Sequence, residues 1–292
     1  MKTSPDSSYL VRDDVTGDWV IVAPGRRKRP EGKKPSGDPF APSRLENERI
    51  LATYGSGANR VTSIENAFPV FRPNRGITGR QEILVETTRG HWESLLHAFA
   101  ERFRVLRTDP KIKYLQAFKN EGATAGASQP HPHAQIFATS FVPDHIRDEA
   151  KRRRSAVKRL GHSAHAHCLS LATPERIIFS DTHVIAYANP AARFAYEVRV
   201  MTRMRRDNIV KTTPAERRSL AKALSALLPL VNKKKFGFNL YFHDVLDESD
   251  EHFEIRFTPR SNTWGGFELD AGVYVNPVPA EDAAQEYRDA KK

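Results

Sequence analysis

The sequence predicts an α+β fold with a mainly antiparallel sheet and flanking helices. One observation is that a strand–helix–strand–loop–strand pattern occurs twice along the chain. A second is that the opening segments of the two units, residues 82–87 and 197–202, share the same kind of alternation. A third is that the later strands of each unit follow one another without a helix, and such strands usually pair as antiparallel neighbours.

The first unit contains a strand, a helix and two further strands. These elements are expected over residues 82–87, 92–107, 114–118 and 133–141. The helix is indicated by Leu95, Phe99 and Phe103, whose spacing places them on one helical face. Before this unit we expect a short strand over 19–22 and a long loop over 25–60, where Pro, Gly, Lys and Ser are frequent.

The second unit repeats this order. Its strands are expected over 197–202, 236–242 and 252–258, with an acidic loop over 243–251. A helix begins after Thr213, because Thr213, Pro214 and Glu216 form the pattern of a capping box with proline at the first helical position. Leu220, Leu224, Leu227 and Leu228 give this helix its apolar stripe.

The two units indicate a duplicated chain. The distance from the opening strand to the strand that begins near a histidine is similar in both halves, from residue 82 to 133 and from 197 to 252. We therefore divide the chain into residues 1–150 and 151–292.

Composition restricts the class of protein. The chain has 46 Lys and Arg against 35 Asp and Glu, and the net charge of +11 suits either an anionic small substrate or nucleic acid. No run approaches the about 18 apolar residues of a membrane span, and no apolar leader is visible, so we expect a cytoplasmic protein. The single cysteine, Cys168, excludes an internal disulfide and a Cys-x-x-Cys metal pair.

Residues 118–136 carry the strongest chemical signal, Phe-Lys-Asn-Glu-Gly-Ala-Thr-Ala-Gly-Ala-Ser-Gln-Pro-His-Pro-His-Ala-Gln-Ile. Small residues allow backbone N–H groups to approach phosphate oxygens, and Asn120 and Ser128 can donate further hydrogen bonds. A histidine with a pKa near its usual 6.5 is a neutral nucleophile at pH 7. The segment therefore predicts a phosphate site that leads to a nucleophilic histidine.

This segment resembles the active-site motif of galactose-1-phosphate uridylyltransferases and their relatives in the histidine-triad superfamily. The resemblance implies two histidine-triad-like repeats. It also implies that His133 attacks the α-phosphorus of the donor and that Gln135 bonds the phosphoryl oxygens, with Ser128 as a further catalytic candidate. A neutral glutamine cannot protonate a leaving group as a third histidine would, which favours transfer over hydrolysis.

Other segments match the same family. The resemblance implies that Arg26 and Arg29 meet substrate phosphates, for which a guanidinium fork is well suited. It implies that Asn66 contacts the nucleoside, and that Phe267 and Glu268 lie in a closing segment that reaches the partner subunit's site. A homodimer is expected on this basis.

The family's two metal sites are altered in this sequence. The cysteine pair of the zinc site aligns with Asp38 and Ala41, which leaves His91 and His131 as two of the four donors that zinc prefers. In the second site Glu149 and His243 match, but the other two positions hold Glu254 and Arg256. We therefore predict no zinc or iron cofactor.

A further group, His162, His165, His167 and Cys168, could bind a metal by composition. We favour a mobile segment with basic flanks at this position.

The predicted function is a nucleotidyltransferase that moves a nucleoside monophosphate, through His133, from a donor such as UDP-glucose to a sugar 1-phosphate, as in galactose metabolism. An ADP-sugar or diadenosine polyphosphate phosphorylase, with phosphate as the acceptor, is a second hypothesis of the same chemistry. A non-catalytic nucleotide- or RNA-binding protein is a third. The intact set of His133, Gln135, Ser128 and Asn120 favours the enzyme, so we expect neither nucleic acid nor membrane as a partner.

Overall fold

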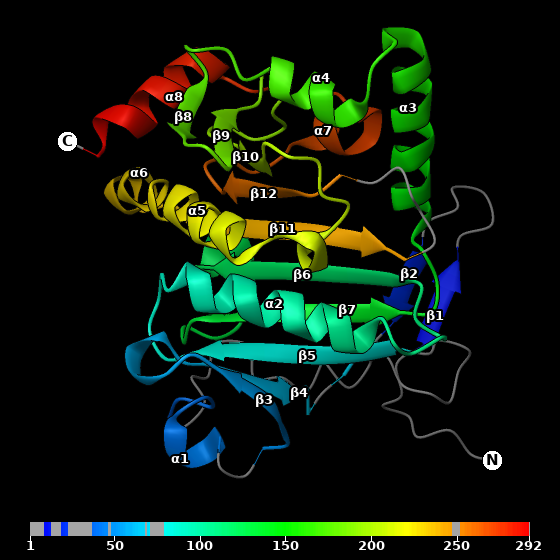
Figure 1. Ribbon diagram of the computed structural model, residues 1–292, viewed down its shortest axis with the longest axis vertical. Coiled ribbons are helices and arrows are strands. Elements are labelled where there is room, and N and C mark those ends of the chain that lie inside the picture. Colours follow the sequence, from blue (N-terminus) through cyan, green and yellow to red (C-terminus); the bar gives the residue numbers. More distant parts are fainter. Residues whose placement is uncertain are drawn as a thin grey trace.

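The computed structural model describes residues 9–12, 19–22, 37–45, 48–67, 69–70, 79–246 and 252–291. Ten strands form one antiparallel sheet in the order β3-β4-β5-β7-β6-β11-β12-β10-β9-β8 (Figure 1). The first half of the chain supplies β3 (Ile50–Tyr54), β4 (Val61–Glu65), β5 (Gly79–Glu86), β6 (Tyr114–Glu121) and β7 (His133–Thr139). The second half supplies β8 (Ile177–Ser180), β9 (Val184–Ala188), β10 (Val198–Thr202), β11 (Phe238–Val245) and β12 (Glu254–Pro259). A separate hairpin pairs β1 (Tyr9–Arg12) with β2 (Trp19–Val22).

The strand order confirms the repeated architecture. From the centre outward, the first half reads β6, β7, β5, β4, β3, and the second half reads β11, β12, β10, β9, β8. The halves meet where β6 pairs antiparallel with β11, and one hydrophobic core extends across both. The division at residues 150 and 151 stays a prediction; both residues lie in the helix α3 (Asp144–Leu160) that follows the first half.

Two equivalent helices cover one face of the sheet. α2 (Trp92–Leu106) and α5 (Pro214–Ser225) pack against each other, and Figure 1 shows them crossing in front of the central strands. Phe99 and Phe103 of α2 and Leu224 of α5 are fully buried. The predicted capping box of α5 (Pro214–Ser225) is confirmed, but Leu227 and Leu228 lie beyond α5, as the N-cap and the first residue of the next helix, α6 (Leu228–Lys234).

Short helices and turns complete the chain. They are α1 (Pro42–Leu45), α4 (Ala164–Ser170), α7 (Gly266–Ala271), α8 (Ala280–Asp289) and the 3₁₀ turns at Gly57–Asn59, Ala123–Ala125 and Ile209–Lys211. Within the described residues, no helix has both the length and the apolar character needed to cross a bilayer.

Several predicted loops are wrong. The described part of the 25–60 loop contains α1 and β3, and β3 escaped detection because an edge strand buries little of its surface. β11 continues to Val245 because β6 supplies a partner at every step, so residues 243–245 are strand. Residues 164–170 form α4, capped by the Ser163 side chain, and are not a mobile segment. β9 was missed because all its residues are buried and no polar alternation marks it.

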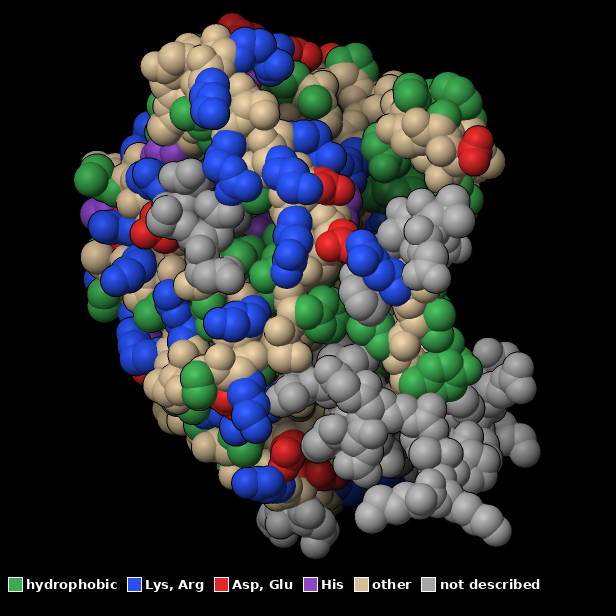
Figure 2. Space-filling view, turned by 90° about the vertical axis from the view of Figure 1, so that its right-hand side faces the viewer, with side chains coloured by type: hydrophobic (Ala, Val, Ile, Leu, Met, Phe, Trp, Pro, Cys, Tyr) green, Lys and Arg blue, Asp and Glu red, His purple; other side chains and the backbone are tan. Residues whose placement is uncertain are grey.

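The face of the sheet opposite α2 and α5 carries polar side chains. His133 and Gln135 stand two residues apart on β7, so they share a face. Gln135 is opposite Phe118 in the register, and Asn120 is opposite Asn239. Lys and Arg side chains are spread over much of the view in Figure 2, with other kinds of side chain between them.

Candidate active site

A tight loop between β6 and β7 leads the chain to His133. Gly122 has a φ of 83° at its start, a conformation that favours glycine. A Cβ atom on Gly237, at the start of β11, would lie 2.5 Å from the Thr124 hydroxyl oxygen and 2.7 Å from the Glu121 carbonyl oxygen. The two glycines therefore allow the loop to lie against the neighbouring half of the sheet.

His133 is the first residue of β7 and is only 6% exposed. Its Nδ1 lies 2.9 Å from the backbone carbonyl oxygen of His131. Because a carbonyl oxygen only accepts, the proton of the neutral ring is on Nδ1, and the lone pair is on Nε2. No described residue hydrogen-bonds Nε2. The ring is thus arranged with one nitrogen held and the other open to an electrophile.

The surroundings of His133 favour its neutral form. Burial lowers the pKa of His133, and the hydrogen bond to the His131 carbonyl offsets this only in part. The positive charge of Lys119 lowers the pKa further, while Glu121 raises it. The net direction is downward, so the imidazole is a free base at neutral pH.

His131 does not point at the same space. Its Nδ1 lies 2.6 Å from Oδ2 of Asp38, and its Nε2 lies 2.9 Å from the carbonyl oxygen of Glu86. Both partners only accept, so both contacts are hydrogen bonds when the ring is protonated. The His131 side chain is therefore occupied by supporting contacts.

Glu86 ties this support to the core. Its backbone N–H donates to the carbonyl of Pro132 at 3.0 Å, and its carboxylate pairs with the ammonium group of Lys119. Lys119 is fully buried and also lies 3.4 Å from Oε2 of Glu121. Burial raises the pKa of Glu86, although Lys119 opposes this shift.

Gln135 is oriented by a second glutamine. Nε2 of Gln81 on β5 donates to Oε1 of Gln135 at 3.1 Å, which directs the Gln135 amide nitrogen away from that contact. Oε1 of Gln81 accepts from the N–H of Val70 at 3.0 Å, and its backbone carbonyl accepts from the N–H of Asn66. Gln81 therefore connects the segment predicted to hold the nucleoside with the residue predicted to hold the phosphate.

A cavity of about 440 Å³ opens on the polar face over β6, β11 and β12, and neither His133 nor Gln135 lines it. Phe118, the cross-strand neighbour of Gln135, lines it together with Asn120, whose Oδ1 accepts from Asn239 at 2.8 Å. Trp264 also lines it, and the indole N–H is buried with no hydrogen-bond partner among the described residues. Arg260 contributes a positive charge. A volume of this size, with polar groups left to satisfy, suits a small polar ligand.

Of the other residues predicted to bind substrate, Ser128, Phe267 and Glu268 are described, and no contact found among the described residues joins them to His133. Ser128 is exposed on the loop, and no described hydrogen bond joins it to His133 or Gln135. Phe267 on α7 is 59% exposed, and Glu268 caps its own helix by accepting from the N–H of Gly265 at 3.0 Å. Arg26 and Arg29 lie outside the described residues.

The position of the family's zinc site does not suit zinc. Asp38 is engaged with His131, and Ala41 has no ligand atom. His91 stands at the N-cap position of α2 without a side-chain capping hydrogen bond, and it belongs to no group of three potential ligands in the described part of the chain. Two histidines and one carboxylate that is already paired do not make a four-donor site.

The position of the second metal site holds a guanidinium group. Nη2 of Arg256 pairs with Glu149 on α3, and its Nε donates to Oε1 of Glu254 at 2.7 Å. Arg199 pairs with the same Glu254 from β10 at 2.9 Å. The fourth position, His243, packs against the ring of Tyr114 with 5.7 Å between ring centroids. The carboxylates that would bind a metal are thus neutralised by arginines.

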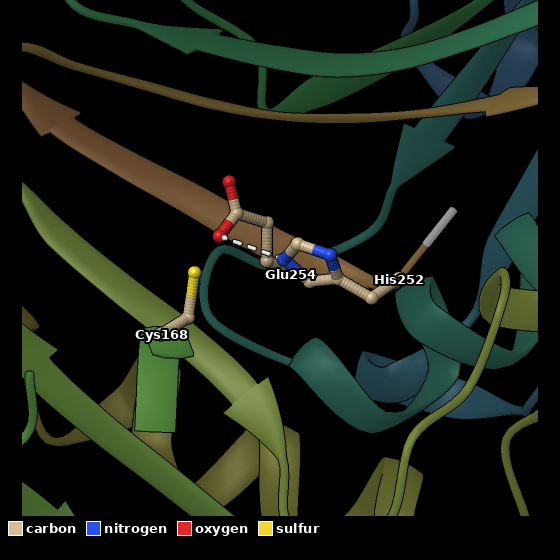
Figure 3. A group of neighbouring side chains, drawn as sticks. All are labelled: Cys168, His252 and Glu254. Atoms are coloured by element: carbon tan, nitrogen blue, oxygen red, sulfur yellow. Dashed lines mark ion pairs between the residues drawn. The ribbon is translucent and has the colours of Figure 1, made fainter. Parts of the chain in front are cut away.

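Figure 3 shows the remaining group of potential ligands among the described residues, Cys168, His252 and Glu254, whose ligand atoms lie within 4.8 Å of one another. Burial lowers the pKa of His252, but contacts with Cys168 and Glu254 outweigh this and raise the pKa to about 9. A metal would have to displace this proton in order to bind. With Arg199 and Arg256 also beside Glu254, the local charge does not suit a cation.

Sequence reasoning missed Gln81 and Phe40 and considered Asp38 only as a lost metal ligand. Gln81 stands between Arg80 and Glu82 on β5, so the sequence does not mark it as buried, yet it is 3% exposed and such a buried polar residue needs a partner. The ring of Phe40 lies 5.3 Å from that of His133, between centroids, but this contact depends on a loop fold that no local pattern predicts.

Residues 81–143 match the family model for the N-terminal domain of galactose-1-phosphate uridyl transferase. Across 95% of the chain, the sequence is 26% identical to a galactose-1-phosphate uridylyltransferase of Thermotoga maritima and covers 96% of that protein. It is 24% identical to an ADP-glucose phosphorylase of Arabidopsis thaliana, over 97% of this chain and 93% of the relative.

Solved structures show the same fold. A crystal structure of an ADP-glucose phosphorylase from Arabidopsis thaliana with bound ADP-glucose superposes with a TM-score of 0.78, at 24% identity, over 97% of this chain and 99% of that one. A structure of a uridylyltransferase superposes with a TM-score of 0.80, at 22% identity, over 96% and 98% of the two chains. The chain therefore shares its α+β fold, with one large antiparallel sheet, with these solved structures.

Proposed function

Because this chain belongs to a galactose-1-phosphate uridylyltransferase-like family, we propose that it transfers a nucleoside monophosphate from a nucleoside-diphosphate sugar to a sugar 1-phosphate. The observation that carries this proposal is the buried His133, whose Nδ1 is held by a carbonyl while its Nε2 has no partner among the described residues. A neutral nitrogen with a fixed ring is what a nucleophilic attack on phosphorus requires.

The reaction has two displacements. In the first, Nε2 forms a bond to the α-phosphorus, the bond from that phosphorus to the bridging oxygen breaks, and the sugar phosphate leaves with the electron pair. In the second, a phosphate oxygen of the acceptor attacks the same phosphorus, and the Nε2–phosphorus bond breaks. The histidine returns to its starting state, and the product is a new nucleoside-diphosphate sugar.

The other residues bind and orient the substrate. The Gln135 amide nitrogen, directed by Gln81, is suited to donate to a phosphoryl oxygen. In this proposal Arg26, Arg29 and Ser128 hold phosphates, and Asn66 holds the nucleoside. The cavity beside Asn120 supports a bound sugar, because Trp264 and Arg260 offer it an unused N–H and a charge.

A second candidate function is supported by the relative in Arabidopsis thaliana, which is named an ADP-glucose phosphorylase and aligns over nearly the whole chain. It uses the same first displacement and differs in the acceptor, inorganic phosphate. RNA binding is disfavoured, because the basic residues of the sequence come in short separate clusters and not along one stripe with interleaved aromatic residues.

Intact mass spectrometry tests the proposal directly. After incubation with UDP-glucose or ADP-glucose, the protein is expected to gain one UMP or one AMP, and the donor that labels it identifies the base. We also propose that no metal is needed, so labelling is expected to be unchanged after dialysis against a chelator. Adding galactose 1-phosphate or inorganic phosphate to the labelled protein then identifies the acceptor. If no nucleoside-diphosphate sugar labels the protein, the binding-protein hypothesis becomes the better one.

The pH dependence of labelling follows from the lowered pKa of His133. The attacking species is the neutral ring, which forms as the pH rises through the pKa, so a lowered pKa shifts the acid limb downward. We expect the half-maximal rate of adduct formation below pH about 6.5, the usual value for histidine. A midpoint above that value would contradict the assigned surroundings of His133.

We further propose a homodimer in which the part of residues 259–277 that follows Trp264 completes the partner's site. Phe267, Leu269, Val273 and Val275 support this, because all four apolar side chains are more than half exposed. Sedimentation is expected to show a dimer, and Phe267→Asp with Leu269→Asp is expected to shift the protein toward monomer and to lower turnover. A wild-type monomer with full activity would contradict the proposal.

A further inference from the structure

We propose that Asp38 is a positioning residue for the nucleophile, taking the place of the metal ion that the position would hold in the wider family. The inference rests on the proposed role of His133. One carboxylate, that of Asp38, fixes two residues near the His133 ring: it contacts the His131 side chain and the backbone N–H of Phe40.

The first contact runs through His131. Oδ2 of Asp38 lies 2.6 Å from Nδ1 of His131, whose other ring nitrogen is held by the Glu86 carbonyl at 2.9 Å. When the ring is protonated, both nitrogens donate, so the ring cannot rotate without losing a hydrogen bond. The backbone carbonyl of His131 is the acceptor for Nδ1 of His133. The carboxylate therefore acts on the nucleophile through one intervening residue.

The second contact runs through Phe40. Oδ1 of Asp38 accepts from the backbone N–H of Phe40 at 2.9 Å, which closes a tight turn. The Phe40 ring lies 5.3 Å from the His133 ring and 5.8 Å from the His131 ring, between centroids. The turn thus places the Phe40 ring beside the His133 ring. This contact helps to bury the His133 ring and to orient it.

The Asp38 carboxylate can accept both hydrogen bonds because it is negatively charged at neutral pH. Partial burial raises the pKa of Asp38, but the hydrogen bond from Phe40 and the contacts with His131 more than offset it and lower the pKa overall. The carboxylate is therefore ionised at neutral pH and accepts two charge-assisted or backbone hydrogen bonds.

The test measures the single-turnover rate of adduct formation on His133 with the donor that labels the wild type. Asp38→Ala is expected to lower this rate about 10- to 100-fold, because small displacements of a reacting group are costly. The KM for the donor is expected to stay within about threefold, since Asp38 does not touch substrate. Asp38→Asn, which keeps a hydrogen-bond acceptor, is expected to retain more of the rate than Asp38→Ala.

A control variant and a double-mutant cycle separate positioning from folding. Asp148→Ala removes an exposed aspartate paired with Lys151 on α3, and it is expected to label at the wild-type rate. Since Asp38 acts largely through His131, Asp38→Ala is expected to cause much less further loss in a His131→Ala background than in the wild type. Thermal melting of Asp38→Ala is expected to stay near that of the wild type, because the side chain is 41% exposed.

The outcomes distinguish the two proposals. If the wild type forms no adduct, the proposed function fails. If the wild type forms one and Asp38→Ala and Asp38→Asn label at the wild-type rate, the positioning role is refuted while the function stands. Full additivity of Asp38→Ala with His131→Ala, or a rise in donor KM that accounts for the whole loss, also refutes it.

Discussion

His133→Ala is expected to form no nucleotidylated species and to lose turnover by about 10⁴-fold or more, because the variant has no atom that can attack the α-phosphorus. The first displacement depends on Nε2, which has no partner among the described residues while Nδ1 is bound to the His131 carbonyl. Intact mass after incubation with UDP-glucose and ADP-glucose measures the adduct, and a coupled assay of sugar phosphate release measures turnover.

The matched control is His97→Ala. His97 lies on α2 and its side chain is 47% exposed, with a contact to Glu101 at 3.9 Å. This variant is expected to label as the wild type does. An adduct that persists in His133→Ala would show that another residue is the nucleophile, and the assignment of the site would then be wrong.

The second large effect concerns Lys119, which is fully buried on β6, the strand next to β7, and is paired with Glu86. Lys119→Met leaves the Glu86 carboxylate without its cation in the core. Breaking one partner of a buried pair costs about 3–5 kcal/mol in the free energy of unfolding. Urea denaturation is the measurement, with the midpoint expected to fall while the slope stays constant.

Two further variants test the cause. The double variant Lys119→Met with Glu86→Gln removes both charges, and it is expected to be more stable than Lys119→Met alone. Lys222→Met, at an exposed position of α5, is expected to change the free energy of unfolding by less than about 0.5 kcal/mol. Equal stability of Lys119→Met and the wild type would mean that the buried pair contributes nothing.

Much of the fold was predictable where the sequence is periodic. α2 and α5 follow from helical spacing and a capping box, and β5, β6, β7, β10, β11 and β12 follow from alternation and from the repeat. β3, β4, β8 and β9 were not predictable, because edge strands and strands buried on both faces leave no alternating signal. Their positions are set by pairing with distant strands, which is information that no local window contains.

The site divides in the same way. His133 and Gln135 could be proposed from the sequence because both stand in one contiguous segment, and their catalytic roles stay a prediction. The roles of Asp38, Gln81 and Arg256 were not, because each depends on contact with a residue at least 50 positions away. The sequence predicted that Arg256 could not ligate a metal, but it did not predict that the same side chain would bind Glu149.

Because Arg256 stands where relatives in the family hold a metal ligand, the contact at this position does not depend on a supply of metal ion. A metal ion is a diffusible component, so the occupancy of its site depends on the concentration of free ion in the surroundings. The guanidinium group of Arg256 is covalently attached and lies between Glu149 and Glu254 in every folded copy, at an effective concentration set by the chain itself. The ion pairs that connect α3 to the sheet at this point therefore form when the chain folds. They do not depend on the chain competing with other proteins for metal ions.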